Sequence, residues 1–506
     1  MVARFLNLSM ILPQTQNRWN PPIRFSTLVL IVGLLPSGIG HAAEPAGSET
    51  PGGPAPVTFR KVRLTDEFWA EGVAVADVNR DGHKDVISGP YWYEGPTFEH
   101  RHAFREAFAS FARTKPDGTT ERVAGYDGAS GWSDDFLTYA ADINGDGWPD
   151  VLVVGFPGKE AAWYENPGAA GLAQGTPWKR HLAFDSVGNE SPAWVDLFQD
   201  GHPVLLFMQG DVLGYGTPDP AAPDGKWVFH PLTTPLPIVQ DMRARYEQEN
   251  GGKPFPYFPY CHGLGCGDVN GDGRLDLLEM EGWWEQPPGG RQGGLWRLHP
   301  WTFLKQRPPA SRVAAGNRHP DYYNWPYALR ASQMYVYDVN GDGRPDLISS
   351  LDAHGYGVGW FEQLANPSGD GEARFEPHFM VEPSGSPNRR GVSFTEPHAL
   401  NVADLDGDGL VDVVTGKRKW AETAKGPDPE TDGASVLYWF KLVRQADHTA
   451  RFVPFLIDHD SGVGEQVWIG DLNGDGRPDL AVSNKNGTFV FLQETPAPLA
   501  DLIQDP

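Results

Sequence analysis

A nine-residue run rich in carboxylates occurs six times along the sequence, and its residue types suit a cation site. The copies are DVNRDGHKD, DINGDGWPD, DVNGDGRLD, DVNGDGRPD, DLDGDGLVD and DLNGDGRPD. Each has Asp at positions 1, 5 and 9, Asn or Asp at position 3 and Gly at position 6. Calcium prefers such hard oxygen ligands around a tight turn. The runs therefore predict calcium loops, and the alternative is a set of Asp-Gly turns that hold no ion.

The predicted calcium ligands occupy the same four positions of each run. They are Asp77, Asn79, Asp81 and Asp85; Asp142, Asn144, Asp146 and Asp150; Asp268, Asn270, Asp272 and Asp276; Asp338, Asn340, Asp342 and Asp346; Asp404, Asp406, Asp408 and Asp412; and Asp471, Asn473, Asp475 and Asp479. A seventh copy, DLFQDGHPV at Asp196, has Phe198 at position 3 and Val204 at position 9. We expect this seventh copy to be metal-free.

The spacing and surroundings of the runs separate them from EF-hands. Their first Asp residues stand 54 to 72 residues apart, about the length of four strands with their turns. An EF-hand also needs a Glu at position 12 and flanking helices. Only Glu279 stands at that position, and β-prone segments such as DVISG and DVLVVG follow the loops. We therefore expect each loop to join two strands.

Seven repeats of four strands predict an all-β fold, a seven-bladed β-propeller of four-stranded blades. An apolar strand precedes each loop and a second follows it. A third carries aromatic residues, as in AWYENPG, which we expect to pack between blades, and a fourth opens with basic or aromatic residues, as in WKRHLAFD. The last repeat ends after FVFLQE, so VTFRKVRLTD at residues 57–66 is expected to supply its fourth strand and close the ring.

One position per repeat lies six residues before the loop, and equivalent blades would place these positions near the axis, on the face opposite the loops. The seven residues are Glu71, Phe136, Glu190, His262, Ser332, His398 and Glu465, and five of them are ionisable. The turns between second and third strands should add Lys159, Asp352, His354, Lys417, Arg418 and Lys485, and Glu396 stands beside His398 in FTEPHAL. A wet channel mouth would by itself explain part of this polarity.

Three of these residues, His262, His354 and His398, come from neighbouring repeats and could hold zinc or another divalent transition metal. A metal with an open position polarises a carbonyl or hydroxyl group. A carboxylate such as Glu465, or a lysine beside it, could move a proton. The sequence therefore predicts a second kind of metal site, opposite the acidic loops.

Two long insertions on the same face are rich in aromatic residues. Tyr257, Tyr260, Tyr322, Tyr323 and Trp325 could stack on the apolar faces of a sugar, or only fill space between loops. A further insertion, residues 105–134, ends in GWSDDF, whose Asp134 and Asp135 could join the polar ring.

Composition limits the remaining possibilities. The 506 residues, 40% hydrophobic, suffice for one large core over residues 57–496 and show no second domain. The net charge of −25 argues against nucleic acid, which needs a basic surface. Cys261 and Cys266 would lie roughly 16 Å apart on a strand, so we expect two free buried thiols.

The N-terminal residues have the layout of a secretory signal, in which basic residues precede the apolar run FSTLVLIVGLLPSGIG and the small residues of HAAE. We expect a signal peptide at 1–43, a linker at 44–56 and a tail at 497–506, in a secreted or periplasmic protein. The alternative is an uncleaved membrane anchor.

The loops and their flanking strands resemble the FG-GAP or VCBS repeats of integrin-alpha-type β-propellers, over nearly all of residues 57–496. More narrowly, GFPGKEAAWYENPG, VGNESPAW and CHGLGCGDVNGDGRLDLLEMEGWWEQP resemble the propeller domain of aldos-2-ulose dehydratases, metal-dependent lyases that remove water from keto-sugars. That resemblance implies a metal on His262, His354 and His398, with Glu190 and Lys159 in proton transfer or substrate contact. Enzymes of that family continue into cupin domains, to which nothing in this sequence corresponds.

Two functions from different classes are consistent with these residues. The first is a calcium-binding propeller that acts as a metal-dependent lyase on a keto-sugar, because a base, a Lewis acid and a pocket are all expected at the mouth. The second is a non-catalytic carbohydrate-binding or adhesion propeller. A serine hydrolase is disfavoured, since no G-x-S-x-G sequence occurs.

Overall fold

The computed structural model describes most of residues 57–494. The described residues are 57–115, 118–237, 240, 243–244, 247–248, 251–252, 260–279, 281–301, 331–366, 372–426 and 428–494. The chain divides into two units, Met1–Pro54 and Ala55–Pro506, and every described residue belongs to the second. The predicted signal peptide, linker and tail lie outside the described residues. Within the described part of the chain, no helix is long and apolar enough to cross a membrane.

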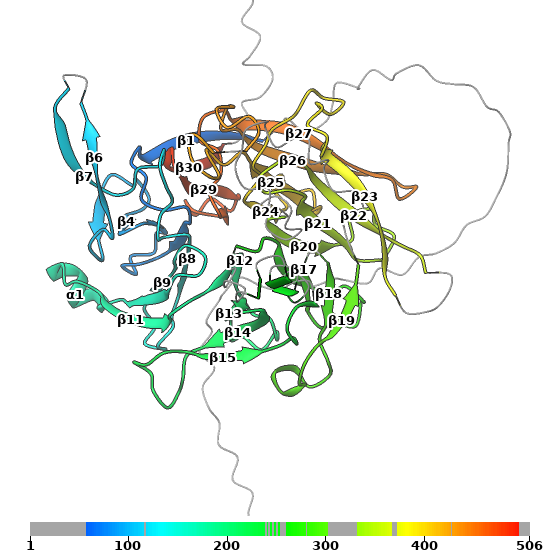
Figure 1. Ribbon diagram of the computed structural model, residues 1–506. Helices are drawn as coiled ribbons and strands as arrows, with labels where there is room; N and C mark the ends of the chain where they lie inside the picture. The colour runs from blue at the N-terminus through cyan, green and yellow to red at the C-terminus, as the bar shows by residue number, and fades with distance from the viewer. Residues whose placement is uncertain are drawn as a thin grey trace, which may run out of the picture. The chain divides into compact units, whose positions relative to one another are not determined.

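Antiparallel four-stranded sheets make up the second unit and lie side by side around a central axis, which confirms an all-β propeller (Figure 1). Five of these sheets are separate. They contain β2 (Ala74–Ala76), β3 (Asp85–Ser88), β4 (Tyr91–Tyr93) and β5 (Arg101–Ala103); β8 (Leu137–Ala141), β9 (Asp150–Val154), β10 (Ala161–Glu165) and β11 (Lys179–Phe184); β12 (Gly188–Val195), β13 (Val204–Gln209), β14 (Val212–Thr217) and β15 (Val228–Pro231); β24 (Leu400–Ala403), β25 (Asp412–Gly416), β26 (Leu437–Arg444) and β27 (Ala450–Asp458); and β28 (Val467–Gly470), β29 (Asp479–Asn484), β30 (Gly487–Glu494) and β1 (Thr58–Thr65).

The remaining propeller strands form one eight-stranded sheet, which differs from the expected seven separate sheets. It contains β16 (Leu264–Gly267), β17 (Asp276–Glu279), β18 (Gly282–Glu285), β19 (Arg297–Pro300), β20 (Gln333–Tyr337), β21 (Asp346–Ser350), β22 (Val358–Leu364) and β23 (Arg374–Val381). Its two halves join where β16 and β20 pair in parallel over two residues each. Glycine permits this approach, because a Cβ atom on Gly265 would lie 2.0 Å from the carbonyl oxygen of Met334.

The N-terminal strand completes the last sheet. β1 pairs antiparallel with β30, with Thr58 opposite Glu494 and Val62 opposite Val490. The ammonium group of Lys61 on β1 also donates a 2.7 Å hydrogen bond to Asp458, at the end of β27 in the neighbouring sheet. The predicted closure of the ring by residues 57–66 is therefore present in the structure.

Aromatic residues of the third strands pack both between and within sheets. Trp163 lies in one core cluster with Leu205 and Phe207 of the next sheet, as predicted. It also stacks on His181 at a ring-centroid distance of 4.0 Å, and the imidazole contacts Glu165 at 2.8 Å. The same Trp–His–Glu arrangement recurs at Trp92, His102 and Glu94, at Trp283, His299 and Glu285, and at Trp360, His378 and Glu362. This stack was not predicted.

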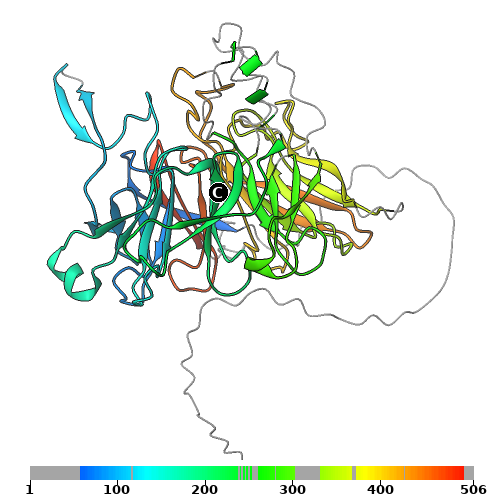
Figure 2. The ribbon, with the colours of Figure 1, turned by 60° about the horizontal axis from the view of Figure 1, so that its bottom comes forward.

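Some short elements lie outside the propeller sheets. β6 (Ser110–Thr114) and β7 (Thr120–Ala124) form a two-stranded hairpin that projects from the sheets, cyan in Figures 1 and 2. α1 (Gly168–Gln174) and the 3-10 turn η1 (Gly290–Gln292) connect the third and fourth strands of their sheets. The hairpin belongs to the insertion that leads into the candidate site.

Candidate functional site

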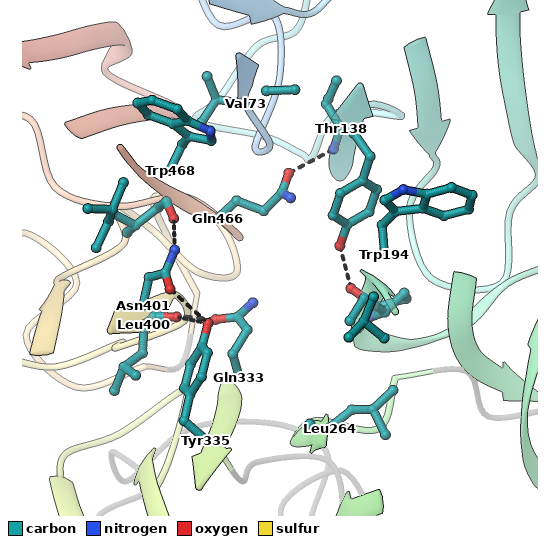
Figure 3. Close-up of a pocket in the computed structure, with 18 of the residues that line it drawn as sticks. Val73, Thr138, Trp194, Leu264, Gln333, Tyr335, Leu400, Asn401, Gln466 and Trp468 are labelled. Carbon is teal, nitrogen blue, oxygen red and sulfur yellow. Dashed lines mark hydrogen bonds between the residues drawn. The ribbon is translucent and has the colours of Figure 1, made fainter. Parts of the chain in front are cut away.

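The innermost strands of the sheets line an axial cavity of about 410 Å³ (Figure 3). Side-chain amides cross it between sheets: Gln466 accepts a 2.7 Å bond from the backbone of Thr138, and Asn401 donates a 2.8 Å bond to Val467. Gln333 donates a 2.8 Å bond to the carbonyl oxygen of Glu465, which belongs to the predicted polar ring. The cavity therefore ends directly beneath that ring.

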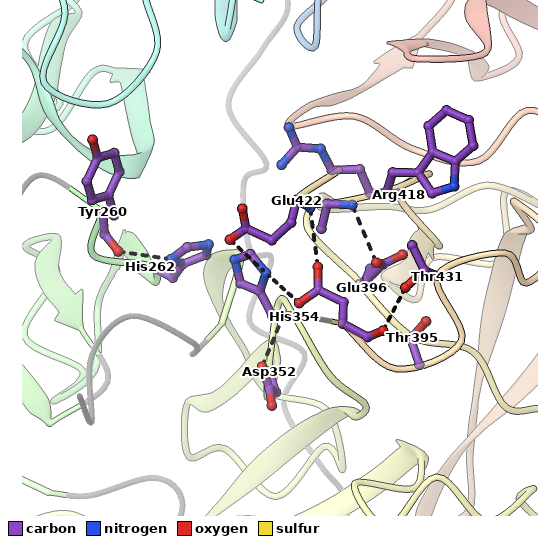
Figure 4. Close-up of polar contacts among 12 residues, drawn as sticks. Tyr260, His262, Asp352, His354, Thr395, Glu396, Arg418, Glu422 and Thr431 are labelled. Atoms are coloured by element: carbon purple, nitrogen blue, oxygen red, sulfur yellow. Dashed lines mark hydrogen bonds and ion pairs between the residues drawn. The ribbon is translucent and has the colours of Figure 1, made fainter. Parts of the chain in front are cut away.

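Three histidine rings meet at this end of the axis. Figure 4 shows two of them, His262 and His354. The centroids of His262 and His354 are 5.1 Å apart, those of His262 and His398 are 5.5 Å apart, and those of His354 and His398 are 4.8 Å apart. One nitrogen from each ring lies within 4.8 Å of the others. Side chains predicted from three separate repeats thus form one cluster.

The histidines differ in their hydrogen-bond partners. Nδ1 of His262 lies 3.3 Å from the carbonyl oxygen of Tyr260, and Nε2 lies 3.2 Å from Oε2 of Glu190. His398 is 1% exposed, and among the described residues neither of its ring nitrogens has a hydrogen-bond partner. A buried imidazole without partners is costly unless something binds it. Burial lowers the pKa of His398 well below its usual value, so the ring is neutral and available as a ligand.

The ring of His354 is held by acids from the segment between β25 and β26. Its Nδ1 lies 3.2 Å from Oδ1 of Asp428 and 3.8 Å from Oε1 of Glu422. Burial alone would lower the pKa of His354, but the charges of Asp428 and Glu422 raise it to about 10. Asp352 accepts a 3.0 Å bond from the backbone of His354. A carboxylate on one imidazole nitrogen leaves the other for a metal, whose binding would displace the proton that the second nitrogen carries.

A network of buried ion pairs surrounds the histidines. Arg418 is 1% exposed and pairs with Glu71 at 2.8 Å and with Glu465. Lys417 pairs with Glu396 and donates a 2.7 Å bond to Thr395. The aromatic ring of Phe136, also in the predicted polar ring, lies 5.3 Å from the guanidinium carbon of Arg418.

Carboxylates outnumber cationic side chains in this cluster. The acids are Glu71, Glu190, Glu396, Glu422, Asp428 and Glu465, and the cations other than histidine are Lys417, Arg418 and Lys485. Burial raises the pKa of Glu465 well above its usual value, and the neighbouring carboxylates Glu190 and Glu71 add to the rise, while burial raises the pKa of Glu396 to about 7. Burial also lowers the pKa of Lys485 to about 8. Buried charges need partners, and a bound divalent cation would balance this excess.

Unusual backbone conformations occur at the same place. Asn189, Glu396 and Trp420 have φ angles of 72°, 58° and 51° although none is glycine. Such conformations cost of order 1–3 kcal/mol each and are concentrated at functional sites.

The six intact acidic loops share one geometry in the structure. In each, Asp at position 1 accepts a backbone bond from Gly at position 6, as from Gly343 to Asp338 at 3.0 Å. Asp at position 9 is buried, and Asp346 accepts backbone bonds of 2.9 Å from Val339 and 2.8 Å from Gln363. Carboxylate oxygens of Asp404, Asp406 and Asp412 lie within 4.8 Å of one another. This hard-oxygen donor set fits calcium.

Basic side chains approach some of these loops. In the seventh copy, the guanidinium group of Arg291 contacts Asp200 at 2.7 Å and donates a 2.7 Å bond to the carbonyl oxygen of His202. This arginine supplies the positive charge where the loop lacks two ligand positions. At the Asp404 loop, Lys441 pairs with Asp406 and, at 2.6 Å, with Asp408. Lys441 stands where four other repeats have the Glu of the Trp–His–Glu stack.

Several residues predicted for the site lie elsewhere or outside the described residues. Lys159 is exposed and lines a different cavity, together with Asp134. Asp135 is buried and pairs with Arg105. Ser332, another member of the predicted polar ring, is buried, and its hydroxyl has no hydrogen-bond partner in the described structure. Tyr257, Tyr322, Tyr323 and Trp325 fall outside the described residues, whereas Tyr260 contacts Phe156 at a centroid distance of 5.6 Å.

Sequence reasoning missed Glu422 and Asp428. Neither has a counterpart in the other repeats, so counting from the loops could not find them; the only signal was the pair Lys417 and Arg418 just before the segment. The cysteines are both free, as predicted; Cys261 is buried, whereas Cys266, beside the axial cavity, is only largely shielded from solvent.

The axial arrangement of sheets and the Asp-Gly loops define a β-propeller. Residues 113–207 and 338–415 match the FG-GAP-like repeat, and residues 463–495 match the FG-GAP repeat. The chain therefore carries FG-GAP repeats. No curated protein matches the sequence.

Several solved structures show a distant similarity of fold. A lectin of Agrocybe aegerita that recognises non-reducing terminal N-acetylglucosamine is 17% identical, with 85% of this chain and 87% of that chain covered and a TM-score of 0.37. The rhamnogalacturonan lyase of Bacillus licheniformis is 11% identical, with 87% and 76% covered and a TM-score of 0.36. Rhamnogalacturonan lyase YesW is 12% identical, with 87% and 76% covered and a TM-score of 0.35. At TM-scores below 0.5, these similarities decide nothing about what this chain binds.

Proposed function

We propose that this protein is a metal-dependent lyase that removes water from a keto-sugar. The observation that carries the proposal is the cluster of His262, His354 and His398, whose nitrogens lie within 4.8 Å of one another. The unpartnered nitrogens of buried His398 support a metal there. Imidazole ligands favour zinc or another divalent transition metal over calcium. Such an ion would act as a Lewis acid toward a carbonyl or hydroxyl oxygen.

The acids around the histidines supply the remaining chemistry. Glu190 lies 3.2 Å from His262, and burial alone would raise its pKa, but the neighbouring His262 lowers it. An ionised carboxylate at this place is suited to take a proton from the carbon beside a carbonyl group. Glu465 is paired with Arg418, and burial raises its pKa well above the usual value, which makes it the poorer base although it lies within 4.8 Å of Glu190 and His398. We therefore assign the base role to Glu190 and a positioning role to Glu465.

The acidic loops are proposed as calcium sites that stabilise the propeller, six in number. We also propose that the eight-stranded sheet acts as two blades, because β16–β19 and β20–β23 each form an antiparallel meander and share only a short parallel pairing. The propeller then has seven blades. Calcium saturates such loops where it is abundant, which agrees with the secreted or periplasmic location proposed from the N-terminal residues.

Metal analysis tests the proposal directly. After exhaustive dialysis, the parent should retain about one transition metal per chain in addition to calcium. A His262→Ala, His398→Ala double variant should lose only the transition metal, together with turnover of keto-sugars. Calcium alone in both proteins would overturn the lyase assignment and leave a carbohydrate-binding propeller, for which the half-buried Tyr260 beside His262 is the supporting observation.

A further inference from the structure

A second cavity lies on the β8–β11 sheet, beside the insertion that precedes β8. Its volume is about 400 Å³, within the range of small-molecule sites. Its lining includes Phe108, Asp134, Lys159 and Tyr164. Neither the axial cavity nor the histidine cluster includes any of these side chains.

The polar groups of this second cavity are available to a ligand. The hydroxyl of Tyr164 is buried, and the side chain is 2% exposed; within the described structure it makes no hydrogen bond of normal geometry, although the guanidinium group of Arg180 lies beside it. The ammonium group of Lys159 likewise makes no ion pair with any described residue. Tyr164 and Lys159, which carry donors, and Asp134, which carries an acceptor, line the same cavity. Buried polar groups in proteins are nearly always hydrogen-bonded, so a ligand that bonded this hydroxyl would be favoured.

One wall of the second cavity is aromatic. The ring of Phe108 is 45% exposed, and the guanidinium carbon of Arg105 lies 3.7 Å from its centroid, which fixes the ring in place. Arg105 is itself held by an ion pair with buried Asp135. A fixed exposed ring beside convergent donors and an acceptor is typical of sites for sugars, whose apolar face stacks while the hydroxyl groups are bonded.

A row of half-buried aromatic rings connects the second cavity to the histidine cluster. Lys159 donates a 2.7 Å backbone bond to Phe156. The ring of Phe156 lies 5.6 Å from that of Tyr260 and 5.2 Å from that of Trp132. The carbonyl oxygen of Tyr260 in turn contacts His262 at 3.3 Å. The two sites are thus joined by surfaces on which a sugar ring can stack.

We propose that the second cavity is a subsite for another sugar unit of the same substrate, so that the protein takes an oligosaccharide with its carbonyl-bearing end at the histidines. This inference rests on the proposed function for the end unit only. It assigns Lys159 to substrate binding rather than to proton transfer. It also implies that Phe156 and Tyr260 contact the oligosaccharide between the second cavity and the histidine cluster.

Binding to an array of defined glycans of one to six units tests this subsite. At least one glycan of two or more units should bind the parent at least tenfold more tightly than its end unit alone. Tyr164→Phe, which removes one oxygen, and Phe108→Ala should each abolish most of that gain. Lys115→Met, on the exposed β6–β7 hairpin, is the matched control and should keep the full gain. Circular dichroism of each variant confirms that it folds.

The outcomes separate this inference from the proposed function. An equal affinity for one unit and for longer glycans, or a gain that survives both Tyr164→Phe and Phe108→Ala, would overturn the subsite. Binding to no glycan at all would overturn it too. The His262→Ala, His398→Ala variant should still bind the longer glycans, because the second cavity holds none of the histidines. If the double variant loses the metal and turnover but still binds the longer glycans, both proposals are supported. If the parent binds these glycans but contains no transition metal, only the subsite is supported.

Discussion

The guanidinium group of Arg418 binds the carboxylate of Glu71 at 2.8 Å, although 347 residues separate them in the sequence. Glu71 precedes β2 in the first sheet, and Arg418 follows β25. The pair therefore links the β2–β5 sheet to the β24–β27 sheet, which lie on either side of the closing sheet formed by β28, β29, β30 and β1. Glu465, which precedes β28 in that closing sheet, binds the same guanidinium group.

Replacing Arg418 should destabilise the protein strongly. Arg418→Met leaves Glu71 and Glu465 buried without their counter-charge, and breaking a buried pair in this way costs roughly 3–5 kcal/mol. Urea unfolding of the parent and variant measures the difference in the free energy of unfolding. Arg63→Ala is the control, because the side chain of Arg63 is 49% exposed and its ion pair with Asp460 is long, at 3.8 Å. This substitution should change the free energy of unfolding by less than about 1 kcal/mol. If both variants changed the free energy of unfolding equally, the buried ion-pair network around the histidines would be contradicted.

The contact between Lys61 and Asp458 should make ring closure sensitive to acid. Burial alone would raise the pKa of Asp458, but hydrogen bonds from Lys61 and from Ser461 lower it to about 2. A depressed pKa means that the stabilisation is complete above the unfolded value of about 3.9 and is lost as the pH falls through about 2. The parent should therefore exceed Lys61→Met in stability at pH 6, with the difference shrinking from pH 4 to pH 2. A difference that stays constant down to pH 2 would refute this assignment.

Removing the closing strand should open the propeller. Deletion of residues 57–66 exposes the edge of β30, which otherwise pairs with β1 over most of its length. An exposed edge strand recruits other chains. We expect a lower melting temperature and concentration-dependent association, measured by calorimetry and light scattering. Melting like the parent, with no association, would show that β1 adds nothing to closure.

The Trp–His–Glu stacks should stabilise sheets according to their burial. The side chain of His181 is 2% exposed, whereas that of His378 is 40% exposed, and both bond a glutamate at 2.8 Å. His181→Ala should lose buried stacking and a hydrogen bond, about 1–3 kcal/mol, and His378→Ala under about 1 kcal/mol. Chemical denaturation of both variants gives the comparison. A larger effect at His378 would mean that burial does not govern the stack.

The cysteines should be unreactive in the folded protein. Burial raises the pKa of Cys266 to about 12 and that of Cys261 further still, and the thiolate is the reacting form. A thiol reagent at pH 8 should label neither residue within minutes in native conditions and two per chain in denaturant. Fast labelling of the native protein would show that the axial cavity opens to solvent.

The sequence was sufficient to predict the propeller because the loop motif repeats at regular distances and fixes the strands on both sides. The same counting found Glu190, His262 and His398, since each precedes its loop by six residues. It could not find Asp428 or Glu422, which lie in an insertion without counterpart in other repeats. Nor could it predict the pairing of β16 with β20, which depends on the space left at Gly265 by a missing side chain. Periodic positions are predictable, whereas contacts made by insertions depend on three-dimensional proximity alone.

The sheet that contains Lys441 departs from its neighbours at several places together. Asp406 replaces the usual Asn of the loop, Lys441 replaces the usual Glu, and Phe455 instead of histidine stacks on Trp439 at 4.8 Å. Each change would be unfavourable alone. Asp406 next to the usual Glu would place two negative charges together, and Lys441 next to the usual His would place two basic groups together without a carboxylate. The repeats of this protein are therefore not interchangeable modules. A loop moved from this sheet into another would have to bring its lysine with it, so duplicated segments can diverge here only through linked substitutions.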